Sequence, residues 1–242
     1  MAHGAQASGR SGFTLIELMI VVALIAVLST LAVPKLLSSR QVANESAAIS
    51  TLRTLSTAQA QLQASSAIDC DSDGAGEFGY FGELAGAVGL REDDGSQAAQ
   101  VGAEALDPAI LATALGFVDG SAVRRSGYIF QMFLPDAGGV GTPEAAGGGM
   151  GASIDPDLAE VFWCCYAWPM DAGSSGNRAF FLNQDGDILQ FNNQSGVYSG
   201  AGGGPDWSAA FSPGSDDLGD DPSNGALGIP GNDGNLWTSL QL

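Results

Sequence analysis

The segment 69–74 carries an aspartate at every second position, namely Asp69, Asp71 and Asp73, and it ends in a glycine. In an EF-hand loop, alternating carboxylates before a sharp glycine turn hold Ca²⁺ through oxygen ligands. The glutamate that closes such a loop would fall on Tyr80, which supplies no carboxylate. The three aspartates are therefore candidate Ca²⁺ ligands in an incomplete loop, and the alternative is a solvated acidic turn.

The chain has three cysteines, Cys70, Cys164 and Cys165. In an oxidising compartment this number permits one disulfide and leaves one thiol over. Neighbouring side chains on a strand point to opposite faces, so we expect Cys164 and Cys165 to lie on different faces of a sheet. We expect Cys70 to bridge to one of them, and three buried, unbonded cysteines are the alternative. Closing so long a loop would stabilise the fold by about 4 to 5 kcal/mol on the chain-entropy model.

Paired carboxylates also occur near the C-terminus, as Asp216 with Asp217 and Asp220 with Asp221. Glycines and prolines surround them, so nothing in the sequence predicts the preorganised geometry that acid-base catalysis requires. A solvated loop is the better interpretation. We expect no catalytic residues in this chain.

The formal net charge is −19, from 27 Asp and Glu against 8 Lys and Arg. A surface this acidic repels phosphate backbones, which disfavours nucleic acid as a partner. The same acidity suits an exported protein, because a solvated anionic face aids solubility and attracts divalent cations.

Residues 13–33 are apolar except for Glu17 and a few small hydroxyl residues. At ~1.5 Å per residue this segment reaches about 31 Å as a helix, which matches the hydrocarbon thickness of a bilayer. The apolar core of a cleavable secretory signal is only about 7 to 15 residues long, so the segment predicts a membrane-spanning helix. A carboxylate in such a helix is unfavourable, so Glu17 needs a compensating partner.

Residues 12–18, GFTLIEL, resemble the processing site of type IV prepilins and type II secretion pseudopilins. The resemblance implies that a prepilin peptidase in the inner membrane cuts after Gly12 and methylates the new amino group of Phe13. It also implies that Glu17 pairs with the Phe13 amine of an adjacent subunit during filament assembly. Pro34 matches the family where the apolar half of its long helix gives way to an amphipathic half, and a proline there favours a kink.

Residues 1–12 would then be a leader, and its removal would take away His3, the single histidine of the chain. Nucleophiles paired with histidine and histidine-ligated metals both need an imidazole. The mature chain would contain none, which disfavours these two kinds of enzymatic site.

The resemblance implies a single-pass inner-membrane protein with its head in the periplasm, which then enters a pilus or a secretion pseudopilus, at the cell surface in the first case. Its partners would be the peptidase, the inner membrane, and copies of itself or related subunits. The number of Lys and Arg on the two flanks of the apolar segment predicts no clear orientation. The alternative is a membrane-anchored binding module that does not polymerise and whose acidic loops bind Ca²⁺ or a basic partner.

The predicted fold is α+β: a long N-terminal helix, membrane-spanning in its first half, packed on a small antiparallel sheet with long Gly- and Asp-rich loops. After the leader and residues 13–33, residues 34–68 are expected to continue the helix in amphipathic form, because no Gly or Pro follows Pro34 in them. The globular α+β head is predicted to occupy residues 69–242.

Within that head, residues 69–126 predict a connecting region with one or two short helices. Aromatic and branched residues predict four strands, at 128–134, 161–168, 178–183 and 188–192. The dipeptide Asp185-Gly186 predicts a tight hairpin between the last two. The aromatic side chains of these strands are expected to form core; they are Trp163, Tyr166, Trp168, Phe180 and Phe181. The segment after Gly196 is rich in Gly, Pro and Asp and predicts a wrapped surface loop or a partly disordered tail.

Overall fold

The computed structural model describes residues 12–93 and 99–240, which fall into two compact units that divide between Ser39 and Arg40. The helix α1 (Leu15–Ser65) belongs to both units and continues through Pro34. It starts two residues later and ends three residues earlier than predicted. Ser66 ends it with a φ of 45°, a left-handed conformation that cannot continue a right-handed helix. The kink at Pro34 stays a prediction.

In the first unit, every described side chain from residue 12 to residue 39 is exposed. An 18-residue stretch of this part of α1 has a mean hydropathy of 2.7, and none of its residues is buried within the protein. The helix is therefore long and apolar enough to cross a membrane. An apolar surface of this kind is stable only when lipid or protein covers it.

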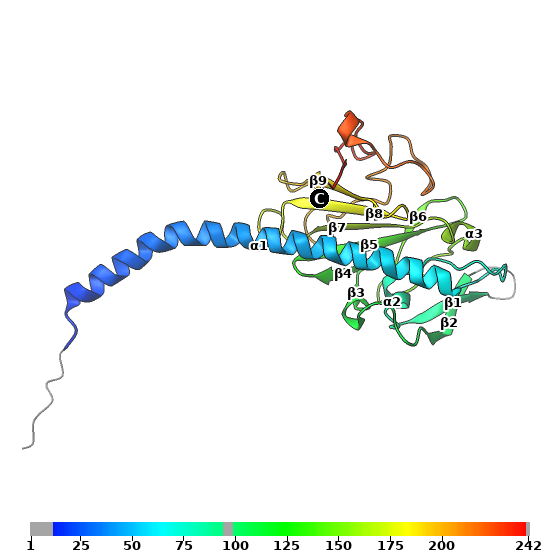
Figure 1. Ribbon diagram of the computed structural model, residues 1–242, viewed down its shortest axis with the longest axis horizontal. Coiled ribbons are helices and arrows are strands. Elements are labelled where there is room, and N and C mark those ends of the chain that lie inside the picture. Colours follow the sequence, from blue (N-terminus) through cyan, green and yellow to red (C-terminus); the bar gives the residue numbers. More distant parts are fainter. Residues whose placement is uncertain (1–11, 94–98, 241–242) are drawn as a thin grey trace, which may run out of the picture. The chain divides into compact units, whose positions relative to one another are not determined.

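The second unit is built on an eight-stranded sheet in which every neighbouring pair is antiparallel (Figure 1). Its order is β10-β9-β8-β7-β5-β4-β3, with β6 paired to β5. The strands are β3 (Val118–Asp119), β4 (Ala122–Arg125), β5 (Tyr128–Pro135), β6 (Gly141–Pro143), β7 (Cys164–Pro169), β8 (Arg178–Asn183), β9 (Ile188–Asn192) and β10 (Thr238–Ser239).

The four predicted strands are confirmed as β5, β7, β8 and β9. The β8–β9 hairpin is confirmed as well, with Gly186 at a φ of 80° in the turn. The predicted start of β7 was wrong, because the chain before Cys164 forms the short helix α3 (Pro156–Ala159) and a connecting turn. Asp155 caps this helix by accepting a hydrogen bond from the Leu158 N–H at 3.1 Å.

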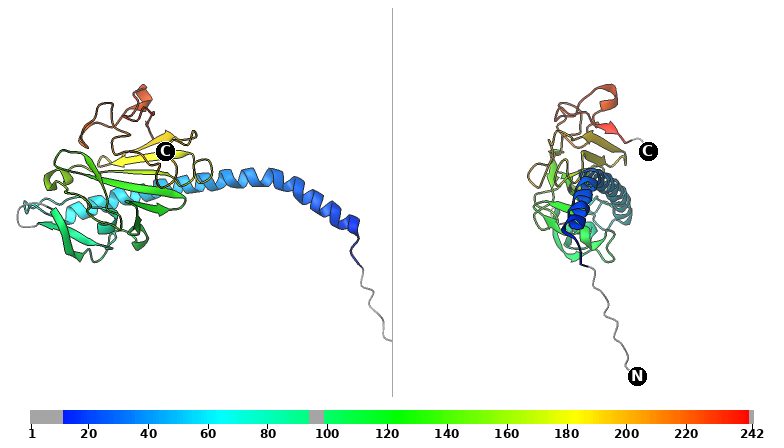
Figure 2. Two further views of the ribbon diagram at one scale, coloured as in Figure 1. Left: turned by 180° about the vertical axis from the view of Figure 1, so that it is seen from behind. Right: turned by 90° about the vertical axis from the view of Figure 1, so that its left-hand side faces the viewer.

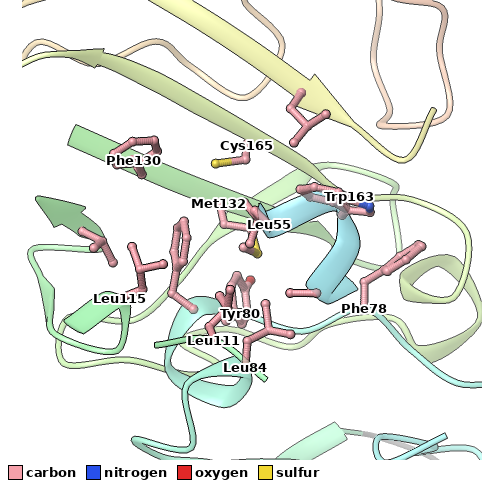
Figure 3. Packing of buried hydrophobic residues seen from close by; sticks show 14 of the residues in the cluster. Leu55, Phe78, Tyr80, Leu84, Leu111, Leu115, Phe130, Met132, Trp163 and Cys165 are labelled. Atoms are coloured by element: carbon pink, nitrogen blue, oxygen red, sulfur yellow. The ribbon is translucent and has the colours of Figure 1, made fainter. Parts of the chain in front are cut away.

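The second part of α1 covers one face of the sheet (Figure 3). Its buried residues Leu52 and Leu55 share a core cluster with Phe130 and Met132 of β5 and with Phe180 of β8. The spacing of the buried helix residues follows the helical period, as expected for one face laid on a sheet. The predicted packing of the helix on an antiparallel sheet is confirmed.

An ion pair fastens α1 to β8 at the other end of this contact. Glu45 is buried and accepts hydrogen bonds from the Arg178 guanidinium, at 2.7 Å, and from the Asn177 N–H, at 2.9 Å. Because both oxygens of the carboxylate are bonded, the helix has a fixed register on the sheet.

The C-terminal segment covers the opposite face of the sheet (Figure 2). Trp237 is fully buried there and packs edge-on against Tyr166 of β7, with the ring centroids 5.8 Å apart. Asp233 accepts a hydrogen bond from the indole N–H of Trp237 and another from the hydroxyl of Tyr198. The segment after Gly196 is thus a wrapped loop that completes a second core, the first of the two alternatives in the sequence analysis.

Residues 69–126 contain more strand than the sequence predicted. One short helix, α2 (Phe81–Leu84), and one 3₁₀ turn, η1 (Thr113–Leu115), agree with the prediction. The sequence did not predict the four strands that the structure describes in this region. They are β3 and β4 of the large sheet, and β1 (Gly89–Asp93) and β2 (Ala99–Ala105), which form a separate hairpin. Strand β2, AQVGAEA, has one branched residue, so its intrinsic preference for extended structure is weak and pairing with β1 stabilises it.

Candidate functional site

Gly12 and Phe13 lie in irregular structure directly before α1, and both are exposed. A Cβ atom at Gly12 would meet no other atom within 4 Å. The fold therefore does not require a glycine at this position, and its small size is available for recognition by another protein. The aromatic residue Phe13 is 81% exposed.

Glu17 forms a capping box with Thr14 at the start of α1. The Glu17 carboxylate accepts hydrogen bonds from the backbone N–H of Thr14, at 3.0 Å, and from its hydroxyl, at 2.9 Å. In return, the Thr14 hydroxyl oxygen accepts from the Glu17 N–H at 3.2 Å. This reciprocal pattern satisfies two donors that the helix end would leave free. The spacing Thr-x-x-Glu signals it in the sequence, and the sequence analysis missed it.

The capping box holds the carboxylate at the helix N-terminus, where the peptide dipoles favour a negative charge. No other residue between positions 12 and 34 is charged. A positive partner for Glu17 must therefore come from outside this segment, and a free amino group at its start or another molecule can supply one. The helix positions the carboxylate within a few residues of Phe13, whose amine the resemblance predicts as that partner.

A first cluster of carboxylates lies where the loop that follows α1 meets α3. Asp71 and Asp73 come together with Asp157 and Glu160 at α3, and one oxygen from each lies within 4.8 Å of the others. Asp69, the third predicted ligand, is not in this group. The sequence analysis missed Asp157 and Glu160, because about 85 residues separate them from the loop and only the fold joins the two segments.

The cluster is crowded with negative charge. The pKa of Glu160 is raised to about 7. Partial burial is the largest cause, and the negative charges of Asp73, Asp71 and Asp157 come next. A hydrogen bond with Asp71 is the main cause that raises the pKa of Asp157. Four carboxylate oxygens this close are the kind of ligand set that a hard divalent cation such as Ca²⁺ prefers.

We expect the processed chain in detergent to bind Ca²⁺ in a calorimetric titration, with a Kd of about 10⁻⁴ to 10⁻³ M, the range of extracellular modules. Replacing Asp71 and Asp157 with asparagine should abolish the binding heat, since two of the four charges are lost. The matched control is Asp185→Asn in the β8–β9 turn, which should leave the heat unchanged. A wild-type chain that gives no heat with millimolar Ca²⁺ contradicts the site.

A second carboxylate cluster joins Asp216, Asp217 and Asp220. Asp217 and Asp220 line a cavity of about 360 Å³, together with Leu158 and Phe162. Asp220 accepts a hydrogen bond from the Asp216 N–H at 2.9 Å. The carboxylates thus contribute to the turn's own hydrogen bonds; Asp216 is exposed, and Asp217 and Asp220 are half-buried. The turn holds these three side chains together, which the sequence did not predict.

A buried group of charged side chains joins α2 to β1. Arg91 is buried, with its Nε 3.0 Å from Glu83 and its Nη1 3.2 Å from Glu77. Its guanidinium lies over the ring of Tyr80, 5.9 Å from the centroid. It also donates to the carbonyl of Phe78. These partners bind the irregular segment after α1 to the β1–β2 hairpin, so the group stabilises the fold.

Glu144 is another buried carboxylate, and it accepts three backbone hydrogen bonds. The donors are the N–H groups of Phe81, Gly82 and Gly149, at 3.2, 2.7 and 2.9 Å. Two of them are the first N–H groups of α2, which have no partner within that helix. Burial is the largest influence and raises the pKa of Glu144 to about 7.

This shift predicts that the head loses stability as pH rises. The folded-state pKa of Glu144 lies above the ordinary value of 4.5, so the folded chain binds this proton more tightly than the unfolded chain. Stability should be greatest below about pH 4.5 as far as this group is concerned. It should fall by on the order of 3 kcal/mol as pH rises through 7. The pKa of Glu77 is also raised, mainly by burial, and adds to the trend with the same sign.

Urea unfolding of the processed chain in detergent, followed by tryptophan fluorescence from pH 5 to pH 8, measures this effect. The variant Glu144→Gln carries no titratable group at this position, so its unfolding free energy should depend less on pH. If the unfolding free energy depends on pH equally in the two proteins, the pKa of Glu144 is not raised by folding.

The three cysteines are buried, free thiols, so the predicted disulfide is absent. Cys70 and Cys165 belong to the core under α1, and Cys164 belongs to the core under the C-terminal segment. The two neighbours thus lie on opposite faces of β7, as expected. Burial raises the pKa of all three thiols, which keeps them protonated and unreactive.

Comparison with known proteins identifies a motif and a relative. The family model described as the prokaryotic N-terminal methylation motif matches residues 7–33. The chain is also 30% identical over 174 residues to the type IV major pilin protein PilA of Myxococcus xanthus (strain DK1622), across 69% of this chain and 73% of that protein. No solved structure matches. The methylation motif contains Gly12, Phe13 and Glu17, and the second match reaches well into the second unit.

Proposed function

Because this chain belongs to the type IV pilin family, we propose that it is a structural subunit of a filament, cut after Gly12 and methylated on Phe13. The observation that carries the proposal is the isolated Glu17 carboxylate at the start of an exposed apolar helix. An unpaired charge on such a surface favours association with a molecule that supplies a positive group and covers the apolar side chains.

In the proposed sequence of events, the precursor first lies in the inner membrane, with residues 13–33 crossing the bilayer and the second unit in the periplasm. The peptidase then exposes the amine of Phe13. Glu17 of one subunit pairs with such an amine on a neighbour as the helix leaves the lipid. Contacts between apolar helices supply most of the attraction, and the charge pair sets their register.

We favour a type IV pilus over a type II secretion pseudopilus. The support is the match to a protein named as a type IV major pilin, which extends over 73% of that protein. Imaging of surface material sheared from cells, labelled with an antibody to the head, would locate the subunit in long surface filaments. A subunit found only in the cell envelope would favour the pseudopilus.

Mass spectrometry of the purified native chain tests the processing step. The expected N-terminus is Phe13 with one added methyl group. The matched control is Gly12→Val, which has room for its side chain and should fold normally but remain uncut. A native chain that starts at Met1, or past Ala32, would overturn the proposal.

A second candidate function is a membrane-anchored binding module that does not polymerise. The specific observation in its favour is the group of four carboxylates around α3, which offers a place for Ca²⁺ or a basic partner. Electron microscopy of sheared material separates the two candidates, because the anchored module yields no filaments.

A further inference from the structure

The exposed arginines of the second unit are Arg40, Arg53, Arg124 and Arg125. Three of them lie toward one end of the head, and Arg53 lies on α1 between the two ends. Arg40 stands at the first position of α1 in this unit, and Arg124 and Arg125 end strand β4. The turn after β4 touches α1, since a Cβ atom at Gly127 would lie 2.7 Å from the amide nitrogen of Asn44. We call this part of the head the basic end.

Acidic residues are also present at the basic end, and most of them are paired. Asp119 lies 3.1 Å from Arg124, and the buried Glu45 lies 2.7 Å from Arg178. Asp171 lies in the loop whose Ser175 carbonyl accepts from Asn44. Arg40 and Arg125 remain exposed, so this end carries a positive balance in a chain of net charge −19.

The opposite end of the head is acidic. Helix α3 lies there, near the end of α1, and the Gln63 side chain donates to the Glu160 carbonyl (Figure 1). Loops from two other parts of the chain gather around α3, together with the chain on either side of the helix. The segments concerned, 69–73, 136–162 and 214–221, contain no Lys or Arg. We call this the acidic end; its carboxylates are Asp71, Asp73, Asp136, Asp155, Asp157, Glu160, Asp216, Asp217, Asp220 and Asp221.

The two ends cannot neutralise each other within one molecule. Arg125 lines a hollow with Thr54 of α1, and Gln63 marks the acidic end. About nine helical residues at ~1.5 Å each separate Thr54 from Gln63 by about 14 Å. This exceeds the screening length of about 8 Å at physiological ionic strength. The charges at the acidic end instead oppose one another, since oxygens of Asp71, Asp73, Asp157 and Glu160 lie within 4.8 Å of one another.

We propose that the acidic end of one head docks on the basic end of the next copy along the filament. This inference rests on the proposed function as a filament subunit. A head-to-tail contact between unlike ends of identical subunits repeats without closing, which is the symmetry that a helical filament requires. Strongly acidic copies repel one another. This contact offsets the repulsion, because it places the crowded carboxylates of one copy against the exposed Arg40 and Arg125 of the next.

Charge exchange tests the proposal in cells that make the full chain as the only copy of this subunit. One variant reverses the basic end, Arg40→Glu with Arg125→Glu. A second reverses the acidic end, Asp216→Lys with Asp221→Lys, and leaves the four candidate Ca²⁺ ligands in place. All four residues are exposed, so the fold should tolerate the changes. Each double variant should lower the yield of sheared filaments by about tenfold, since like charges then meet. The fourfold variant should recover most of the wild-type yield.

The possible outcomes separate this proposal from the proposed function. Wild-type cells without filaments would overturn the function as a filament subunit. Filaments at normal yield from both double variants, or no recovery in the fourfold variant, would overturn the docking alone. If only the acidic-end variant fails, and a chelator disperses wild-type filaments, a divalent cation holds that end and the docking is also wrong. Membrane levels of processed chain, measured by immunoblot, show whether a variant was made and cut.

Discussion

The change Glu17→Ala is expected to lower the yield of sheared filaments by about 100-fold or more, while the amount of chain in the membrane stays at the wild-type level. Removing one member of a desolvated ion pair typically destabilises by about 3 to 5 kcal/mol, because the other charge stays buried and unpaired. Membrane insertion should persist, since an alanine only makes residues 13–33 more apolar. Quantitative immunoblots of sheared and membrane fractions measure both quantities.

The variant Glu17→Gln is the matched control for this prediction. Its side-chain oxygen can still accept from the Thr14 N–H, so the helix cap is kept while the charge is lost. If charge pairing controls assembly, the glutamine variant should fail as the alanine variant does. Normal filaments from either variant would show that apolar packing alone sets the register.

The change Arg91→Met is expected to lower the free energy of unfolding of the head by about 3 to 5 kcal/mol. Methionine fills a similar volume, but Glu77 and Glu83 would remain buried without their cation. Most single domains are stable by only about 5 to 15 kcal/mol, so the variant should be close to unfolding. Urea unfolding of the processed chain in detergent, followed by tryptophan fluorescence, measures the loss.

Two further variants control this second prediction. Arg53→Met removes an exposed arginine from α1 and should change the unfolding free energy by less than about 0.5 kcal/mol. Combining Arg91→Met with Glu77→Gln and Glu83→Gln should recover part of the loss, because no charge then lies buried alone. If Arg91→Met by itself is as stable as wild type, the buried group contributes nothing to the fold.

The long N-terminal helix could be predicted because its signals are local. The apolar run, the isolated Glu17 and the glycine before Phe13 lie within about 20 residues of one another, so distant parts of the chain do not alter their meaning. Strands β5, β7, β8 and β9 were predictable for a similar reason, since aromatic and branched residues fill them. Both faces of β7 are buried, which makes its apolar sequence continuous.

The rest depended on contacts between distant segments. Strand β2 is rich in Ala and has no strong local preference, so only its partner β1 defines it. The carboxylate cluster needed Asp157 and Glu160, which the fold brings to Asp71 and Asp73. The predicted disulfide was wrong because a count of cysteines gives no distance between them, and the structure has three free thiols in two separate cores.

The burial of Trp237 near the C-terminus has a consequence for biosynthesis. This side chain packs on Tyr166, about 70 residues earlier in the sequence, so the second core cannot be complete until Trp237 has been synthesised. Until then, the rings of Tyr166 and Phe181 stay open to water and to chaperones. A premature stop codon that removes Trp237 would therefore release a chain with an uncovered aromatic face, which cellular proteases should degrade.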